Sequence, residues 1–329
     1  MNSFLEAVRV YFEEKNRAWL TGSLQSLQRA ARAKPEAGWF RRIGYNIDVK
    51  RRCARWRQGK LLRAHTRIRI YNIQYKPETS AKWAEAAVEE SITWVYRDGR
   101  DYGVESRVIA HLMQWRWKDG KWRLDSDMET DERHPLAFAR EAERPAKHLP
   151  MMTIQRHVER TTCNRYDRVK ALRYAELWWN AANPDFVKLE DDCTNFISQC
   201  LFAANLPMTG QGHRGTGWWY QFDASLKSEN WSYSWTTSQA LYLHLLAKAG
   251  AVRVDSAQDL KIGDVVFYDW DGSGKYHHTT IVTDFDNRGD PLVNAHTDAS
   301  WHRHYLYLDS RAWTQRTRYA FVHLPDRIC

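Results

Sequence analysis

The chain has 329 residues, of which 43% are hydrophobic and 27% are charged, and its formal net charge is +9. This length predicts two domains or one large one, and this composition is typical of an ordinary globular protein rather than a disordered or fibrous one. No window holds eighteen uncharged apolar residues, so we expect no transmembrane helix and no integral association with a membrane.

The positive charge is concentrated in the first half of the chain. Residues 1–160 carry 32 Lys and Arg against 21 Asp and Glu, a net of +11, whereas residues 161–329 carry 17 against 19, a net of −2. The densest basic stretch is VKRRCARWRQGKLLR, residues 49–63. It predicts either a solvated basic helix face or a contact with an anionic polymer, such as nucleic acid, an anionic membrane surface or an acidic wall polymer.

The amino-terminal segment reads as an amphipathic helix rather than as a signal peptide. Its apolar side chains Phe4, Val8, Tyr11 and Phe12 fall at helical spacing, and charged residues interrupt every apolar run. We therefore expect a cytoplasmic protein, with export by a non-classical route as the alternative.

The five cysteines are odd in number and widely scattered, and no two form a Cys-x-x-Cys pair. This pattern argues against a disulfide framework and a cysteine-rich zinc site, and it favours a reducing compartment. The cysteines are Cys53, Cys163, Cys193, Cys200 and Cys329.

Helices precede strands in the first 130 residues. A helical pattern runs to about residue 63 and gives way to the alternation of strands, at residues 66–75, 87–98, 102–119 and 121–128. The Asp-Gly steps at 98–99 and 119–120 indicate hairpin turns. We expect a smaller α+β domain of unknown role over residues 1–130, in which a helix packs on a curved antiparallel sheet. The charged, proline-containing residues 131–160 are the predicted linker to a second domain, residues 161–329.

The second domain repeats the order of helices followed by antiparallel strands. A helix is predicted over residues 166–180, ended by Asn183-Pro184, and further helices begin after Asp192 and cover residues 235–250. The predicted strands are residues 261–272, 277–285, 291–297 and 318–324.

The stretch LEDDCTNFISQCLFAANLPM, residues 189–208, places a cysteine at the head of an apolar helix. Asp192 is a good N-cap, because its carboxylate can accept a backbone N–H of the first turn. Cys193 is then the first helical residue, where free N–H groups and the helix dipole favour a nucleophilic thiolate and can hold an oxyanion. Asn195 would support such a site, and Cys200 belongs to the core.

A nucleophilic cysteine needs a base and a group that orients the base. His277 and His278 begin a predicted strand, and because strand residues alternate, just one of the two can face the helix. Asn294 on the next strand is a candidate orienting residue, and His296 has the same parity and competes with it. The aromatic side chains Trp218, Trp219 and Tyr220 either line a substrate cleft or belong to the core.

Several stretches of the second half carry a family resemblance: YDRVKALRYAELWWNAANPDF, DDCTNFISQCLFAANLPM, GWWY, KIGDVVFYD, HHTTIV and PLVNAHTDAS. Over roughly residues 165–325 the chain resembles the putative amidase domain family of bacteria, which is similar to the NlpC-type and CHAP branches of the papain-like cysteine peptidases. The resemblance implies a helix that carries the cysteine against an antiparallel sheet that carries the histidine. It also implies Cys193 as nucleophile, His278 as base and Asn294 as third residue. The doubled histidine departs from the family pattern.

These features predict a cysteine amidohydrolase that cleaves a peptide or peptidoglycan-derived amide through a thioester. One alternative is an acyltransferase that uses the same Cys-His pair, and another is a non-catalytic module that binds an anionic polymer. We expect no cofactor and no metal, because the sequence has neither a Cys-x-x-Cys pair nor a His-Glu-x-x-His motif.

Overall fold

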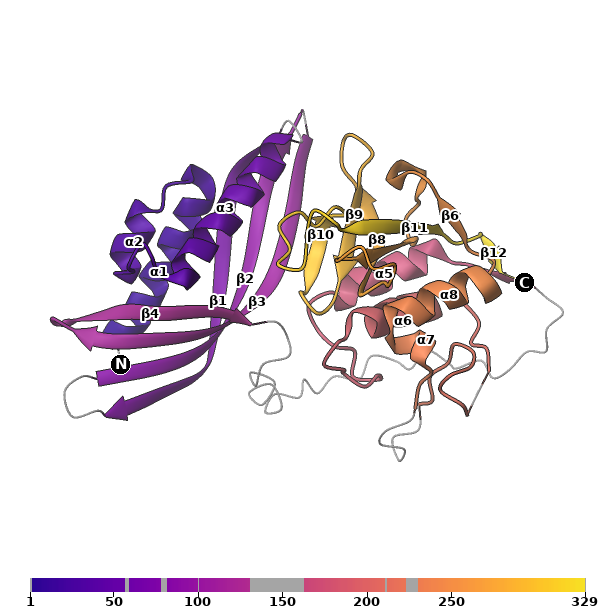
Figure 1. Ribbon diagram of the computed structural model, residues 1–329, viewed down its shortest axis with the longest axis horizontal. Helices are drawn as coiled ribbons and strands as arrows, with labels where there is room; N and C mark the ends of the chain where they lie inside the picture. Colours follow the sequence, from indigo (N-terminus) through magenta and orange to yellow (C-terminus); the bar gives the residue numbers. More distant parts are fainter. Residues whose placement is uncertain are drawn as a thin grey trace.

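The computed structural model shows an α+β chain, as the sequence predicted, and its main sheet is a single large antiparallel one that the sequence did not predict (Figure 1). The predicted linker, residues 131–160, lies outside the residues that the structure describes. Those are residues 2–56, 59–77, 82–99, 101–130, 163–210, 212–222 and 230–328.

In the first unit, three helices cover one side of a curved sheet (Figure 1). The side chains of Phe4, Val8, Tyr11 and Phe12 are all buried against that sheet, so the amphipathic helix predicted there is confirmed. The helices are α1 (Asn2–Thr21), α2 (Gln25–Ala31) and α3 (Gly38–Trp56). The strands are β1 (Gly59–Pro77), β2 (Lys82–Asp98), β3 (Asp101–Lys118) and β4 (Lys121–Thr130).

The basic stretch 49–63 is not one solvated helix face. Helix α3 ends at Trp56 and β1 begins at Gly59, so the helical pattern predicted to residue 63 ends earlier. Lys50, within this stretch, is 4% exposed and lies in a buried cluster of charges. The stretch therefore divides between helix, strand and core.

Turn chemistry fixes the predicted hairpin between β3 and β4. Lys118 pairs with Lys121, which leaves the two-residue loop Asp119-Gly120. Both loop residues have positive φ, 52° and 73°, as a type I′ turn requires. The Asp98-Gly99 step likewise ends the pairing of β2 with β3 at Asp98 and Asp101.

The second unit combines helices with strands. Some of these strands were predicted from the sequence and others were not. Helix α5 ends at Trp178, ahead of the predicted Asn183-Pro184 stop, and α6 begins at Cys193 as predicted. The short strands β5, β6, β10 and β12 were missed. The helices are α5 (Arg168–Trp178), α6 (Cys193–Ala203), α7 (Tyr233–Thr236), α8 (Ser238–Lys248) and the 3-10 helix η1 (Ala257–Asp259). The strands are β5 (Asn164–Arg165), β6 (Val252–Val254), β7 (Val265–Asp269), β8 (His278–Phe285), β9 (Pro291–Ala295), β10 (Ser300–His304), β11 (Arg318–His323) and β12 (Arg327–Ile328).

The sheet of the second unit has a different apolar core on each face. Ile281 of β8 lies in the core that includes Phe196 and Cys200 of α6. Val282, the next residue, lies in the core on the other face with Tyr268 and Tyr307. Since successive strand residues point to opposite faces, this division shows which β8 side chains can approach α6.

One continuous sheet joins the two units. Strand β10 pairs with β3 at Ser300–Arg107 and Trp301–Ser106, and the backbone N–H of Val108 donates to the carbonyl of Ala299 at 3.1 Å. The strand order is β1-β2-β3-β10-β9-β8-β7-β11-β6, with β4 on β3. Each unit keeps a hydrophobic core of its own.

One cysteine departs from the expectation that the chain has no disulfides. Cys163 is disulfide-bonded, whereas Cys53, Cys193 and Cys200 are not in disulfides. The other half of that disulfide lies outside the described residues. Within the described ranges, none of the helices combines the length and apolar character that crossing a membrane requires.

Candidate active site

Helix α6 places Cys193 at its first position, 7% exposed, as the sequence predicted. Asp192, however, does not cap the helix with its side chain. Its Oδ1 instead accepts the backbone N–H of Leu189 at 3.1 Å and the Nδ2–H of Asn195 at 2.8 Å. The predicted cap is therefore wrong, because the carboxylate is turned back toward the preceding loop and across to β9.

The Cys193 sulfur lies where α6 meets the ends of β8 and β9. Its Sγ is 3.7 Å from the Thr194 hydroxyl, and the backbone of Thr279 also hydrogen-bonds to it. The Cys193 backbone N–H donates to the Thr297 hydroxyl at 3.2 Å. In this state the predicted oxyanion donor is therefore already occupied, so a substrate oxyanion would have to displace Thr297.

Burial raises the pKa of the Cys193 thiol, and hydrogen bonds from Thr194, Thr279 and Thr297 oppose that rise without reversing it. The sequence led us to expect a thiolate favoured by the helix end. The structure corrects this expectation, because desolvation of the charged form outweighs the surrounding donors.

We expect slow alkylation of Cys193 by iodoacetamide near neutral pH, with a rate that climbs into the alkaline range between about pH 6 and about pH 10 as the thiol ionises. The Cys53→Ala variant is the starting protein, because Cys53 is a half-buried thiol outside any disulfide that would also react. Labelling is read by mass spectrometry of the peptide containing Cys193, with Cys200 in the same chain as the buried reference. Fast labelling already near pH 6 would contradict the raised pKa.

His278 begins β8 and is 8% exposed. Its ring packs among Tyr268, Trp270 and Tyr307, and it has the parity of Val282, so it lies on the sheet face away from α6. Burial lowers the pKa of His278 to about 4, so the imidazole is neutral near pH 7. Within the described residues its Nε2 has no hydrogen-bond partner, and no hydrogen bond joins it to Cys193.

Asn294 is held by groups other than His278. It pairs with Ile281 and shares the face of α5, where its Nδ2 donates to the carbonyl of Ala175 and to Glu176, each at 3.2 Å. Its Oδ1 accepts from the Thr283 hydroxyl at 3.0 Å and from a backbone N–H of β10. The structure thus does not place Asn294 against His278, since the two project from opposite faces of the sheet.

His296 is the histidine that faces α6. Its Nδ1 is 2.6 Å from Asp192 Oδ2 and its Nε2 is 2.7 Å from the carbonyl oxygen of Trp178. The ring stacks on Phe196 with a centroid separation of 4.0 Å. Asn195 completes this arrangement, because its Oδ1 accepts from Trp235 while its Nδ2 holds Asp192.

His277 precedes β8 and is exposed. With Asp269 and Asp271 it offers ligand atoms within 4.8 Å of one another, and Asp286, Asp290 and His304 form a second group of that kind. Asp269, however, already accepts the backbone N–H groups of Gly272, Ser273 and Gly274, which fix the turn before His277. In the first group, the Asp269 carboxylate therefore already stabilises this turn.

The aromatic residues predicted either to line a cleft or to belong to the core belong to the core. Trp218, Trp219 and Tyr220 are 0%, 1% and 6% exposed. Trp218 donates to Ser198 of α6 at 3.0 Å and stacks on Trp235. In this structure these side chains therefore offer almost no surface to a ligand.

The sequence did not single out Thr279 and Thr297 as contacts of Cys193. Both follow a histidine in quoted motifs, HHTT and NAHT, so the motifs themselves were the available signal. Behind the sulfur, the hydroxyls of Thr194 and Thr279 both lie within 3 Å of Ser238 Oγ, at 2.9 and 2.8 Å. These buried hydroxyls fix the α6–β8 contact from which the thiol projects.

Comparisons with known proteins point to the same region of the chain. Residues 165–322 match the sequence model of a family described as "Putative amidase domain". The second unit is thus similar to this family, whose description, at a coarse level, suggests hydrolysis of amides. Cys193, His278, Asn294 and His296 all fall within the matched range.

Two curated relatives match as well, both from Bacillus subtilis (strain 168). The uncharacterized protein YhbB is 48% identical over 165 residues, which are 49% of this chain and 51% of that protein. The uncharacterized protein YjcM is 30% identical over 138 residues, 38% of this chain and 30% of that protein. The chain thus spans about half the length or less of these relatives. No solved structure matches the chain significantly.

Proposed function

We propose that the second unit is a cysteine-dependent amidohydrolase of papain-like design, in which Cys193 is the nucleophile and His278 the base. The observation that carries the proposal is the position of Cys193. It is the first residue of a buried helix, inside the amidase-like range, with its sulfur against the start of β8. Peptide or peptidoglycan-derived amides are the proposed substrates.

Two features support His278 as the base. It directly precedes Thr279, whose backbone contacts the Cys193 sulfur. It is also neutral near pH 7, with an Nε2 that has no hydrogen-bond partner among the described residues. The proposal requires a Cys193–His278 hydrogen bond that forms with substrate, and catalytic hydrogen bonds often tighten when substrate binds.

The proposed chemistry follows from a neutral thiol and a neutral imidazole. As Cys193 Sγ bonds to the amide carbonyl carbon, its proton passes to His278. The imidazolium then protonates the leaving amine as the C–N bond breaks, which leaves a thioester. His278 next takes a proton from water, whose oxygen attacks the thioester carbonyl, and the carboxylic acid leaves as the thiol is restored. Movement of Thr297 would free the Cys193 N–H for the oxyanion.

The two histidines give a direct test. We expect His278→Ala to lower turnover of amide substrates by about 10²- to 10⁴-fold, the usual contribution of a general base, while folding is kept. We expect His296→Ala to act mainly on stability, because it leaves Asp192 buried without its partner. A panel of peptide aminomethylcoumarin amides supplies the rates, and the free energy of urea unfolding separates the effects.

The opposite result would reassign the base. Should His296→Gln remain fully folded and lose turnover while His278→Ala keeps it, the Asp192–His296 pair would be the catalytic one. The acyl-enzyme itself is read as a mass increase on the peptide that contains Cys193.

A further inference from the structure

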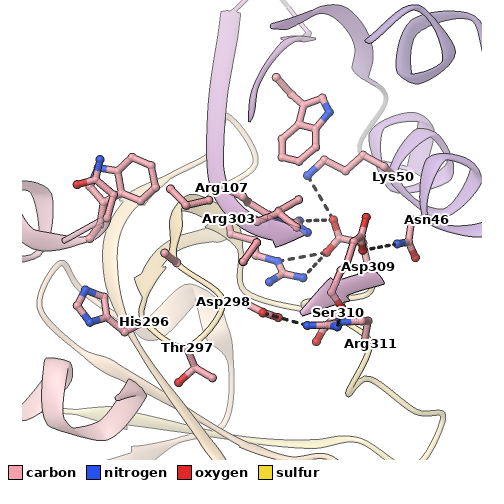
Figure 2. Close-up of a pocket in the computed structure, with 18 of the residues that line it drawn as sticks. Asn46, Lys50, Arg107, His296, Thr297, Asp298, Arg303, Asp309, Ser310 and Arg311 are labelled. Carbon is pink, nitrogen blue, oxygen red and sulfur yellow. Dashed lines mark hydrogen bonds and ion pairs between the residues drawn. The ribbon is translucent and has the colours of Figure 1, made fainter. Parts of the chain in front are cut away.

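A cavity of about 90 Å³ lies between the two units, beside the site but distinct from the residues proposed to react (Figure 2). The first unit contributes Trp19, Trp94, Lys50 and Arg107 to its lining, and the second contributes the turn after β9 together with Arg303. In Figure 2, Lys50 and Asn46 lie on one side, His296 and Thr297 lie on the other, and Arg303 lies between them.

The charged cluster beside this cavity holds more cations than carboxylates. Three cations share two carboxylates: the buried Lys50 and Arg303 and the half-buried Arg107 contact the buried Glu105 and the half-buried Asp309. Lys50 Nζ is 2.5 Å from Glu105 and 3.3 Å from Asp309, and Arg303 is 2.9 Å from Asp309. Of the other two carboxylates of the lining, Asp298 is paired with Arg311, and Glu129 lies 3.6 Å from Lys15, which Glu90 also holds at 2.8 Å.

Within the cluster of Lys50, Arg107, Arg303, Glu105 and Asp309, three cations therefore meet two carboxylates, and incomplete compensation of a buried charge is costly. The crowding is visible in Lys50, where burial and the neighbouring Arg107 lower the pKa of the ammonium to about 8. An anion in the cavity would neutralise the cluster.

The lining also contains hydrogen-bond donors without acceptors. Among the described residues, Arg303 Nη1 and the indole Nε1 atoms of Trp19 and Trp94 are buried and have no partner. Arg303 is 2% exposed, and its Nε and Nη2 both donate to Asp309. Donors left without acceptors in a polar cavity favour a ligand that supplies oxygen acceptors.

The cavity is connected to the proposed reacting groups. Thr297 lines it and accepts the N–H of Cys193. Asp298 and Arg303, which also line it, are the charged groups that influence His278. A ligand that fills the cavity therefore contacts Thr297, which holds the Cys193 N–H, and lies among charges that influence His278.

We propose that this cavity binds a carboxylate of the substrate, so that the enzyme acts on peptide-like amides that carry a carboxylate near the cleaved bond. That the bound carboxylate belongs to a substrate rests on the proposed function, whereas the anion site itself does not depend on it. It gives the first unit a role, because two of the three cations belong to α3 and β3.

Calorimetry on the full chain tests the site with N-acetylglutamate and, as its uncharged match, N-acetylglutamine. We expect N-acetylglutamate to bind at least about 10-fold more tightly, the size of one charge-assisted hydrogen bond. The exposed lining residue Ala182 allows a variant that disturbs no core. Ala182→Glu should weaken N-acetylglutamate binding several-fold, whereas Ala182→Gln should not. A folded Arg303→Met variant should lose the preference for N-acetylglutamate over N-acetylglutamine.

The outcomes separate the two proposals. Equal binding of the two probes, or no binding of either, overturns the carboxylate site whatever the activity of Cys193. Selective binding that Ala182→Glu weakens, in a protein that hydrolyses no amide, keeps the anion site and overturns the hydrolase. When both hold, amides with an acidic residue beside the cleaved bond should show a lower KM than their neutral matches, and Ala182→Glu should remove that difference.

Discussion

Cys193→Ala is expected to abolish amide hydrolysis, with a loss of at least about 10³-fold in turnover, because a methyl group cannot form the thioester. The fold should survive, since the change removes a single sulfur atom at the end of α6. Cys193→Ser tests the nucleophile further, because a hydroxyl without a strong base attacks poorly.

Cys200→Ala is the matched control, because it makes the same change seven residues later in the same helix. Cys200 is fully buried in the core of the second unit, and burial raises its thiol pKa well above the ordinary value. Its replacement should cost some stability and leave turnover intact. Equal activity of Cys193→Ala and the wild type would rule out Cys193 as the nucleophile.

Glu90→Ala is expected to destabilise the first unit by about 3–5 kcal/mol, the usual result of removing one partner from a buried charge network. Glu90 Oε2 is 2.8 Å from Lys15 Nζ and 3.1 Å from His111 Nε2, and the side chains of all three are at most 1% exposed. His111 Nδ1 in turn is 2.8 Å from Asp127. Two fully buried carboxylates thus meet two bases, and loss of Glu90 leaves the buried Lys15 with the more distant Glu129, at 3.6 Å.

Urea unfolding monitored by tryptophan fluorescence measures this loss, because Trp94 and Trp115 lie in the same core. Glu89→Ala is the matched control, since Glu89 is the neighbouring, less buried residue on the opposite face of β2. A change below about 1 kcal/mol in Glu90→Ala, within the range of an exposed ion pair, would contradict the network's importance.

The same network predicts how stability depends on pH. Asp127 and the other partners raise the pKa of His111 to about 9, despite its burial. The folded-state pKa lies above the unfolded one, so this contribution is complete below about pH 6.5 and is lost as the pH rises through about 9. It amounts to about 3 kcal/mol. Glu90 and Asp127, with pKa values lowered to about 2, act in the opposite direction and lose their contribution as the pH falls from about 4 toward 2.

Thermal unfolding of the first unit between about pH 6 and about pH 10 checks the alkaline side of this prediction. The wild type should lose stability over that range, and His111→Gln should be less stable at the outset but depend less on pH there. A flat wild-type profile would mean that His111 is not the protonated member of the network.

The sequence by itself determined the features that depend on neighbouring residues. The amphipathic face of α1, the start of α6 at Cys193 and the positive-φ turn at Asp119-Gly120 follow from periodicity, an apolar run and turn chemistry. Such signals are local, because they arise from contacts within a few residues along the chain.

Tertiary structure alone decided which groups meet. The pairing of β8 with β9 sets Ile281 opposite Asn294, and this register sends Asn294 and His296 to one face and His278 to the other. A shift of this register by one residue would exchange the two faces, and no local sequence pattern specifies the register. Likewise Arg107 and Asp309 meet across some two hundred residues because β3 pairs with β10, so the charged cavity between the units exists in the folded sheet and in no segment of the sequence.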